Sequence, residues 1–160
     1  MDIGVISDTH LDEPTNELEK LCDTVFSKVD LILHAGDITN HLVLDVFYPI
    51  PVIAVAGNMD PLSTRSQLKE KEIIVREGFY IGLTHGWGAP LGLEQRVRGV
   101  FGPEVDCIVY GHSHIPANHV EDGLLFFNPG TFGRGLISMG RRTVGVLHLG
   151  DEITGEIIRL

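Results

Sequence analysis

The chain has 160 residues, of which 43% are hydrophobic and 21% are charged, so we expect residues 1–160 to form a single domain with one sizeable core. This composition excludes extensive disorder, and no apolar run approaches the roughly 18 residues that span a bilayer. The 12 Lys and Arg against 22 Asp and Glu give a net charge of −10. Such a field repels phosphate polymers, which argues against a nucleic-acid polymer as a partner.

Two cysteines, Cys22 and Cys107, lie far apart in apolar segments and form neither a disulfide framework nor a Cys-x-x-Cys pair. The first residues enter a strand-like run directly, without the basic and apolar regions of a secretory signal. We therefore expect a cytoplasmic protein with reduced thiols and no membrane contact. Assembly into a homo-oligomer is left open.

Apolar runs alternate with helical patterns over the first half of the chain. Strands are predicted at Asp2–Ser7, Leu31–Leu33 and Val52–Ala56. With Asn16 as its N-cap, an amphipathic helix of about three to four turns is predicted to extend to Val29. A second, short helix is predicted near residues 40–47, ahead of two prolines. The alternation favours βαβ units with a parallel sheet.

The second half reads as strand pairs around one helix. A hairpin is predicted from Ile73–Arg76 and Tyr80–Thr84, and a helical pattern covers residues 93–101. Cys107–Tyr110 reads as a buried strand, and from Asn118 onward strands alternate with turns. The strands predicted in that last part are Leu124–Phe127, Thr143–His148 and Glu152–Arg159. Both halves fit an α/β sandwich of two mixed β-sheets with helices outside.

Polar side chains follow five of these apolar runs. In open α/β sheets, sites form outside the carboxyl ends of the strands, so we expect these side chains to converge. The Asp8-x-His10 and His112-x-His114 pairs each place two of them two residues apart, and an extended backbone would point both members of a pair to one side. The seven candidate metal ligands are Asp8, His10, Asp37, Asn58, His85, His112 and His114.

The ligand types indicate the metal. Four His, two Asp and one Asn without a Cys suit Mn²⁺, Fe²⁺, Co²⁺, Ni²⁺ or Zn²⁺ and disfavour a thiolate-bound structural zinc. Seven ligands exceed the needs of one tetrahedral ion, whereas two ions that share a carboxylate would use them all. The sequence therefore predicts two divalent transition-metal ions per chain, with Mn²⁺ favoured.

The ordered motifs resemble those of the calcineurin-like metallophosphoesterases, and most closely their small archaeal and bacterial branch related to Vps29. The matching motifs are Asp8-x-His10, Gly36-Asp37, Gly57-Asn58-x-Asp60, His85-Gly86 and Gly111-His112-x-His114. The resemblance implies a four-layer α/β/β/α sandwich with a dinuclear centre. It implies that Asp8, His10, Asp37 and His114 hold one ion, and that Asn58, His85, His112 and a bridging Asp37 hold the other.

The implied activity is metal-dependent hydrolysis of a small phosphoester, more specifically a phosphodiester, by a hydroxide that the two ions activate. Asp37 and Asn58 would be the catalytic side chains, and Asn58 would also hold phosphate oxygens. Arg134, in the glycine-rich stretch 130–135, is a further candidate donor to the phosphate. The alternatives are a phosphomonoesterase and a Vps29-like protein-binding scaffold that retains the metal site.

Two positions depart from the family pattern. Met59 occupies the place of the usual His of the Gly-Asn-His motif, and a thioether cannot transfer a proton. Trp87 occupies the place where many relatives have a second His after His-Gly, and it would either pack at the rim or stack on a substrate ring. We therefore expect modest rates and a preference for good leaving groups, because general acid help of typically about 10²–10⁴-fold would be missing.

Overall fold

Two β-sheets form the centre of the computed structural model, which describes residues 1–133 and 142–160. Within these residues, the first sheet has the strand order β10-β9-β1-β2-β3 and the second the order β4-β5-β6-β8-β7. The strands of the first sheet are β1 (Asp2–Ile6), β2 (Leu31–His34), β3 (Val52–Ala54), β9 (Thr143–Leu149) and β10 (Ile153–Arg159). Those of the second are β4 (Lys71–Arg76), β5 (Phe79–Thr84), β6 (Cys107–Val109), β7 (Ala117–Glu121) and β8 (Leu124–Asn128).

Each sheet contains three neighbouring parallel strands and is completed by antiparallel ones. The parallel strands are β1, β2 and β3 in the first sheet, and β5, β6 and β8 in the second. In the first sheet, β9 pairs antiparallel with both β1 and β10. In the second sheet, the edge strands are β4, which pairs antiparallel with β5, and β7, which pairs antiparallel with β8. Parallel strands end on the same edge of a sheet, so the loops after them can meet there.

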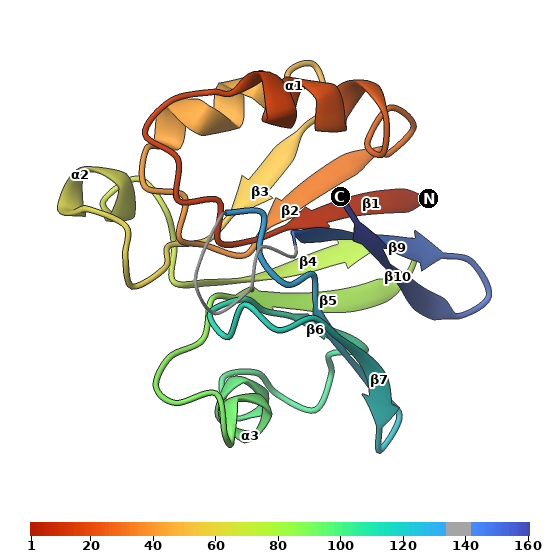
Figure 1. The fold of residues 1–160 in the computed structure, drawn as a ribbon. Coiled ribbons are helices and arrows are strands. Elements are labelled where there is room, and N and C mark those ends of the chain that lie inside the picture. The colour runs from red at the N-terminus through yellow and green to blue at the C-terminus, as the bar shows by residue number, and fades with distance from the viewer. Residues whose placement is uncertain (134–141) are drawn as a thin grey trace.

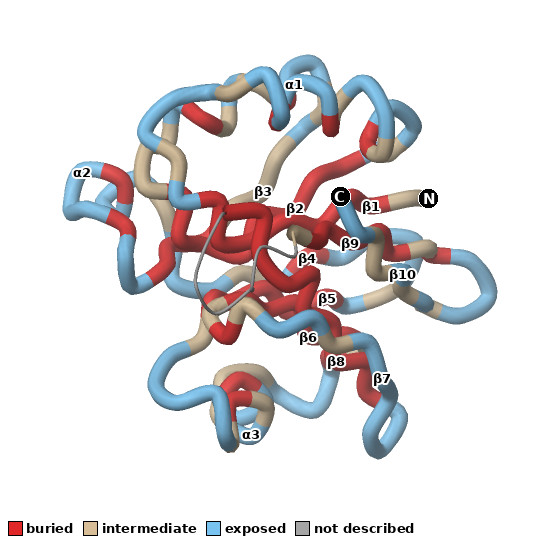
Figure 2. Tube along the Cα trace, viewed as in Figure 1, coloured by how far each residue is buried: buried red, intermediate tan, exposed pale blue. Residues whose placement is uncertain are grey.

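The core lies between the two sheets, and the alternation of side chains along the strands explains it. Ile3 and Val5 of β1 point inward with Ile81 and Leu83 of β5, and all four are fully buried. The inner strands, such as β1, β5 and β6, run through the centre of Figure 2 as its main buried segments. Because strand residues i and i+2 share a face, the residue that follows Val5, Ile6, points to the outer face and contributes to a second cluster there.

Helices cover both outer faces and complete the four layers of the predicted sandwich (Figure 1). Leu18 and Leu21 of α1 (Asn16–Asp23) pack with η1, a 3₁₀-helix (His41–Phe47), on the first sheet. Leu93 and Val97 of α3 (Leu93–Arg98) pack on the second sheet. The predicted α/β fold class is therefore confirmed.

The first helix is shorter than its apolar pattern predicts. Thr15, rather than Asn16, is the N-cap, and its hydroxyl accepts from the backbone N–H of Leu18 at 3.3 Å. The helix ends after Asp23, where the Thr24 hydroxyl donates to the carbonyl of Lys20 at 2.7 Å and competes with the helical bonding pattern. The remaining apolar residues, including Phe26, still pack on the sheet from turns. Apolar spacing therefore gave the buried face but not the length of the helix.

Other elements differ from their predicted bounds by one to three residues, and two elements had no predicted bounds. Strand β3 ends at Ala54 rather than Ala56. Strand β7 had no predicted bounds, because its side chains are mostly exposed and give no apolar alternation. The one-turn helix α2 (Leu62–Arg65) was not predicted, since four residues are too short for a periodic signal.

Among the described helices, none is long and apolar enough to cross a membrane.

Candidate metal centre

Backbone hydrogen bonds fasten the loops after the parallel strands to one another. The N–H of Asp8, after β1, donates to the carbonyl of Gly36, after β2, at 3.0 Å. The N–H of Gly111, after β6, donates to the carbonyl of His85, after β5, at 3.1 Å. These bonds hold the candidate ligands of four loops in fixed register, as expected from the meeting of parallel strand ends.

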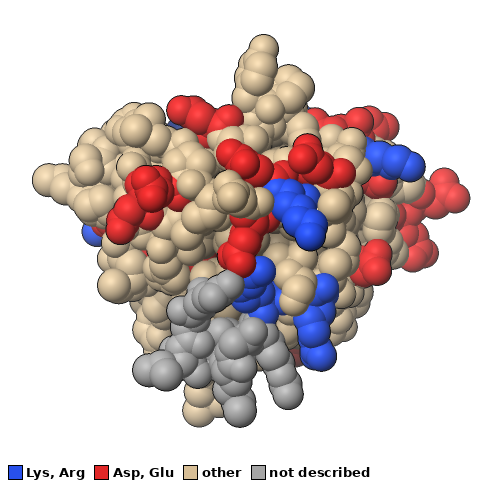
Figure 3. Space-filling model, turned by 45° about the horizontal axis from the view of Figure 1, so that its top comes forward, with Lys and Arg blue, Asp and Glu red and all other residues tan. Residues whose placement is uncertain are grey.

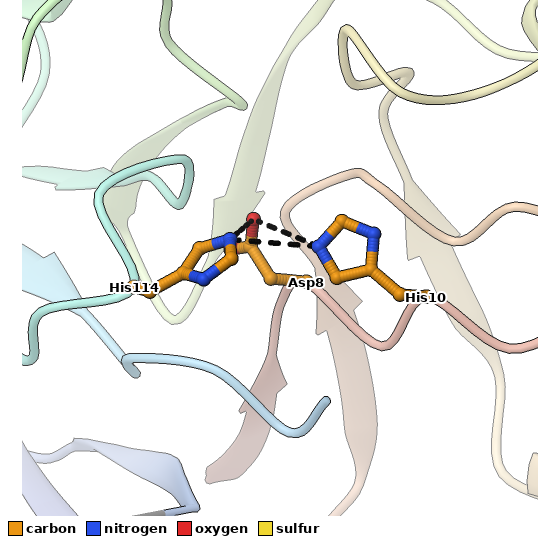
Figure 4. A group of neighbouring side chains, drawn as sticks. All are labelled: Asp8, His10 and His114. Carbon is orange, nitrogen blue, oxygen red and sulfur yellow. Dashed lines mark hydrogen bonds and ion pairs between the residues drawn. The ribbon is translucent and has the colours of Figure 1, made fainter. Parts of the chain in front are cut away.

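Asp8, His10 and His114 form the first group of side chains that could hold a cation. The Oδ1 atom of Asp8 lies 3.0 Å from Nε2 of His114 and 3.9 Å from Nε2 of His10. The two Nε2 atoms are 3.5 Å apart, and Figure 4 shows the three side chains pointing toward one another. Two imidazoles and a carboxylate that converge in this way offer the mixed nitrogen and oxygen ligands that suit first-row divalent ions.

Asp37 lies between this group and a second one. Its Oδ2 atom is 3.9 Å from Nε2 of His10 and 3.4 Å from Nε2 of His85. Asp8, Asp37 and His85 themselves form a buried group with metal-ligand spacing. One carboxylate oxygen of Asp37 therefore faces histidines of both groups.

Asn58 and His112 extend the second group toward solvent. The Oδ1 atom of Asn58 lies 3.1 Å from Nε2 of His85 and 2.8 Å from Nδ1 of His112. Asn58 is exposed, whereas Asp37 and His85 are buried. The structure thus brings all seven sequence-predicted ligands together, with the carboxylates at the floor and Asn58 and His10 at the open side.

Hydrogen bonds to two backbone carbonyls determine which ring nitrogens of His85 and His112 face this centre. Nδ1 of His85 lies 2.7 Å from the carbonyl of Ala35, and Nε2 of His112 lies 2.7 Å from the carbonyl of Gly88. A carbonyl only accepts, so these two nitrogens carry the hydrogens. In the neutral rings, the opposite nitrogens present lone pairs to Oδ1 of Asn58, which is itself an acceptor. An arrangement of acceptors around one point fits a bound cation, and metal-ligating histidines are commonly oriented in this way.

The environment of Asp8 supports the same conclusion. Its Oδ2 atom accepts from the Ser7 hydroxyl at 2.6 Å and from the N–H of His112 at 3.1 Å. Its Oδ1 atom is buried and receives no well-aligned hydrogen bond among residues 1–133 and 142–160, although Nε2 of His114 lies 3.0 Å away. A buried carboxylate oxygen without a donor is costly unless a cation satisfies it. The residues present therefore fit a divalent ion.

Proton equilibria of the centre follow from the same contacts. Burial alone would raise the pKa of Asp37, but the hydrogen bond and charge of His85 and the N–H of Met59 hold that pKa below its ordinary value. Burial alone would lower the pKa of His85, but Asp37 and Asp8 raise it. The Asp8 carboxylate, with Oδ1 3.0 Å from Nε2 of His114, raises the pKa of His114 as well. The carboxylates thus attract positive charge to the imidazoles, as they would to a metal ion.

The ligands converge through turns rather than through extended backbone, and here the sequence argument was wrong. Asp8 and His10 have φ angles of 52° and 49°, and His112 and His114 have φ angles of 68° and 59°. Asp37, at 56°, shares this left-handed conformation. It costs a non-glycine residue on the order of 1–3 kcal/mol, and such strain is concentrated at functional sites. The convergence of these side chains therefore comes with backbone strain that lowers the stability of the loops.

The glycines before the ligands allow the loops to approach closely. A Cβ atom on Gly57 would overlap Oδ1 and the backbone nitrogen of Asp37. A Cβ atom on Gly111 would overlap the Ser7 hydroxyl and lie 2.8 Å from Oδ2 of Asp8. The Gly-Asn and Gly-His motifs are thus explained by packing of backbone against the buried carboxylates.

Several residues that position the ligands were not predicted as site residues. Asp60 is buried and accepts at 2.7 Å from the N–H groups of both Thr39 and Gly57, which ties the loop of Asn58 to the loop of Asp37. His34 is fully buried, and burial lowers its pKa to about 3. Its Nδ1 atom accepts from the N–H of Gly36 at 3.2 Å. The sequence signal that could have identified Asp60 as a positioning residue is its place in the Gly57-Asn58-x-Asp60 motif.

The remaining candidates lie around the centre. The Met59 side chain is 63% exposed, while its N–H donates to Oδ1 of Asp37 at 2.7 Å. Trp87 is 49% exposed and lines a cavity of about 560 Å³ beside Asn58 and His85. Arg134 lies outside the described residues.

The comparison with family models assigns the chain to a class. Residues 1–152 match the model described as the calcineurin-like phosphoesterase superfamily domain. This protein therefore belongs to the calcineurin-like phosphoesterases, as the motifs predicted, and the fold and the convergent ligands agree with that membership.

Two individual relatives with similar sequences carry metallophosphoesterase names. The chain is 42% identical over 133 residues to a probable metallophosphoesterase of Methanocaldococcus jannaschii, covering 81% of this chain and 67% of the relative. It is 36% identical over 165 residues to a probable metallophosphoesterase of Methanothermobacter thermautotrophicus, covering 98% and 91%. Both similarities support a phosphoesterase of the metal-dependent kind.

Solved structures show the same fold at low sequence identity. An archaeal phosphodiesterase superposes with a TM-score of 0.77 at 22% identity over the whole of both chains. Vps29 of Entamoeba histolytica, in a complex with Zn²⁺, superposes with a TM-score of 0.74 at 22% identity over 99% of each chain. The fold is thus shared by a phosphodiesterase and by Vps29.

Proposed function

We propose that this protein, as one domain of residues 1–160, hydrolyses phosphodiesters with the help of two divalent metal ions. The observation that carries the proposal is the position of Asp37, whose Oδ2 atom faces His10 on one side and His85 on the other. Asp8, His10, Asp37 and His114 would hold one ion. Asp37, Asn58, His85 and His112 would hold the second, so that Asp37 bridges the two.

The donor set favours Mn²⁺, with Fe²⁺, Co²⁺, Ni²⁺ and Zn²⁺ as alternatives, because it combines imidazole with carboxylate and amide oxygen. The two cysteines do not belong to this donor set. Both are free thiols, and burial raises the pKa of the Cys107 thiol well above its usual range, which disfavours the thiolate form that binds metals. When bound, two such ions would lower the pKa of a water molecule and neutralise charge that develops on the phosphoryl oxygens.

The side chains of this protein would orient the substrate and the ligands. Asn58 is exposed at the mouth of the centre, where its Nδ2 group could donate to a non-bridging phosphate oxygen while Oδ1, which lies beside His85 and His112, would help to hold an ion. His85 and His112 are held in one tautomer each by the carbonyls of Ala35 and Gly88. No imidazole stands at position 59, and the exposed Met59 side chain offers no proton to a leaving group.

The test is a metal titration joined to an activity assay. Calorimetry with Mn²⁺ should give about two ions per chain, and the loaded protein should hydrolyse bis(p-nitrophenyl) phosphate faster than p-nitrophenyl phosphate. Asn58→Ala should lose activity, whereas Asn118→Ala, on the exposed strand β7, should not. Faster hydrolysis of the monoester would favour a phosphomonoesterase. Two bound ions without any hydrolysis would favour the scaffold function that the likeness to Vps29 suggests.

A further inference from the structure

A cavity of about 560 Å³ opens directly beside the candidate metal centre. Asn58 and His85 form one part of its wall, and Arg65, Lys71 and Trp87 form other parts. In Figure 1 these residues belong to the two loops that carry α2 and follow β5, and to the start of β4. The volume lies within the range of about 300–1,000 Å³ that is usual for small-molecule sites.

Strand pairing places Lys71 next to the metal centre. Lys71 is the first residue of β4 and pairs with Thr84, the last residue of β5, immediately before His85. The backbone before it is fixed on the other side as well, because the carbonyl of Lys69 accepts from the N–H of Ala56 at 2.8 Å. Lys71 therefore stands at a fixed place between the loop of Asn58 and the loop of His85.

Among the charged side chains that line the cavity, Lys71 is the one without a carboxylate partner among the described residues. Arg65 faces Glu70 at 3.7 Å, so these two charges offset each other. The Nζ atom of Lys71 donates to the carbonyl of Val100 at 2.9 Å, and among the described residues no carboxylate oxygen lies within 4.0 Å of it. A neutral carbonyl takes one of three ammonium hydrogens, which leaves donors for an anion. The chain as a whole has a charge of −10, so a cavity wall with a net charge of +1 is a local exception.

Trp87 adds an aromatic surface to the same wall. Its side chain is about half exposed, and Arg96 fixes its loop by donating from Nε to the Trp87 carbonyl at 2.8 Å. On the face seen in Figure 3, acidic side chains are widely spread and several basic side chains lie among them. An indole face and an ammonium group together suit a ligand with a planar ring and a negative charge.

We propose that this cavity binds one ester arm of the substrate, and that this arm carries an aromatic ring and a second anionic group that Lys71 binds. The proposal rests on the proposed function, because it assumes that the scissile phosphate lies at Asn58 and His85. It narrows the substrate to phosphoesters with two separate negative charges. Lys71 would determine specificity and take no part in the chemistry.

A binding measurement tests this without turnover. The probes are 4-carboxyphenylphosphonate and 4-carbamoylphenylphosphonate, whose P–C bonds cannot be hydrolysed and which differ only in a carboxylate against a neutral amide. Trp87 is the only tryptophan of the chain, so its fluorescence reports on the cavity. In the Mn²⁺-loaded protein we expect the carboxylate probe to bind about tenfold more tightly than the amide probe.

Two matched variants assign the preference to one side chain. Lys71→Gln should abolish the tenfold preference and leave the Kd of the amide probe unchanged, while Lys71→Arg should retain the preference. Lys69→Gln removes the same charge two residues away, from a side chain that pairs with Glu72 at 2.6 Å and does not line the cavity. It should bind both probes as the wild type does.

Equal Kd values for the two probes in the wild type would overturn the proposal, as would equal losses in Lys71→Gln and Lys69→Gln. A Lys71-dependent preference in a protein that hydrolyses no phosphodiester would support the anion site and contradict the proposed function. The two proposals can therefore fail separately.

Discussion

His112 donates from Nε2 to the backbone carbonyl of Gly88 at 2.7 Å, and this bond turns its Nδ1 atom toward Asn58. The carbonyl belongs to a loop without regular secondary structure, so something else must hold it in place. Arg96 of α3 does so by donating to three carbonyls of the loop, those of Trp87, Ala89 and Leu91. The second group of ligands thus depends on an arginine that does not belong to it.

Arg96→Gln should weaken binding at one of the two proposed metal sites and spare the other. The reason is that a loosened Gly88 carbonyl no longer fixes the tautomer and orientation of His112, and loss of such support typically costs about 10–100-fold in metal affinity. Calorimetric titration with Mn²⁺ measures both sites. Arg98→Gln, on the same helix, is the control and should bind both ions as the wild type does. Equal affinities in Arg96→Gln and the wild type would contradict the positioning role.

Asp37→Ala should lose both metal ions more readily than Asp8→Ala. One oxygen of Asp37 lies within 4.0 Å of both His10 and His85, whereas among the described residues the histidines within that distance of Asp8 are His10 and His114. Elemental analysis after dialysis gives the number of ions retained. Asp12→Ala, which changes an exposed carboxylate, should retain both. Retention of both ions by Asp37→Ala would exclude a bridging role for this residue.

Buried His34 should make the metal-free protein sensitive to acid. Burial lowers its pKa from 6.5 to about 3, so the folded protein keeps it neutral while the unfolded chain takes up a proton below about pH 6.5. Its contribution to stability is complete above pH 6.5 and is lost as the pH falls toward 3. One pKa unit corresponds to about 1.4 kcal/mol, so the loss would approach about 3 kcal/mol at pH 4.5.

Urea unfolding in the presence of a chelator measures this effect between pH 7 and pH 4.5. His34→Gln should be less stable at pH 7, because the N–H of Gly36 loses its acceptor, but its stability should fall less with acid. His41→Gln, which alters a partly exposed histidine, should keep the slope of the wild type. The same slope in His34→Gln would mean that other groups carry the acid sensitivity.

The sequence predicted which side chains converge, because each follows an apolar run and the ends of parallel strands meet by topology. It could not predict how they converge, since the positive φ angles of Asp8 and His112 depend on contacts between loops. The orientation of His112 depends on Gly88, and the place of Lys71 depends on its pairing with Thr84. Such relations join residues distant in the chain, and no local pattern encodes them.

Met59 marks the position at which the chain departs from the usual motif of its family. Its N–H donates to Oδ1 of Asp37 at 2.7 Å, and every substitution except proline retains that bond. Its side chain is exposed beside the centre, so an imidazole can replace it without disturbing the core. Met59→His should therefore supply a proton donor to the leaving group while the candidate metal ligands stay in place.

The expected gain is larger for alkyl than for aryl leaving groups, because an aryl oxide departs without protonation. A tenfold gain on an alkyl diester would correspond to about 1.4 kcal/mol of barrier. The gain should shrink as the pH rises above about 6.5, since only the imidazolium donates a proton. Rates of the wild type, Met59→His and the non-titrating control Met59→Gln on both diesters across pH give the result, with metal content measured in each. Equal changes on the two substrates without a new pH dependence would show that position 59 sets the shape of the site, and that missing acid catalysis does not limit this enzyme.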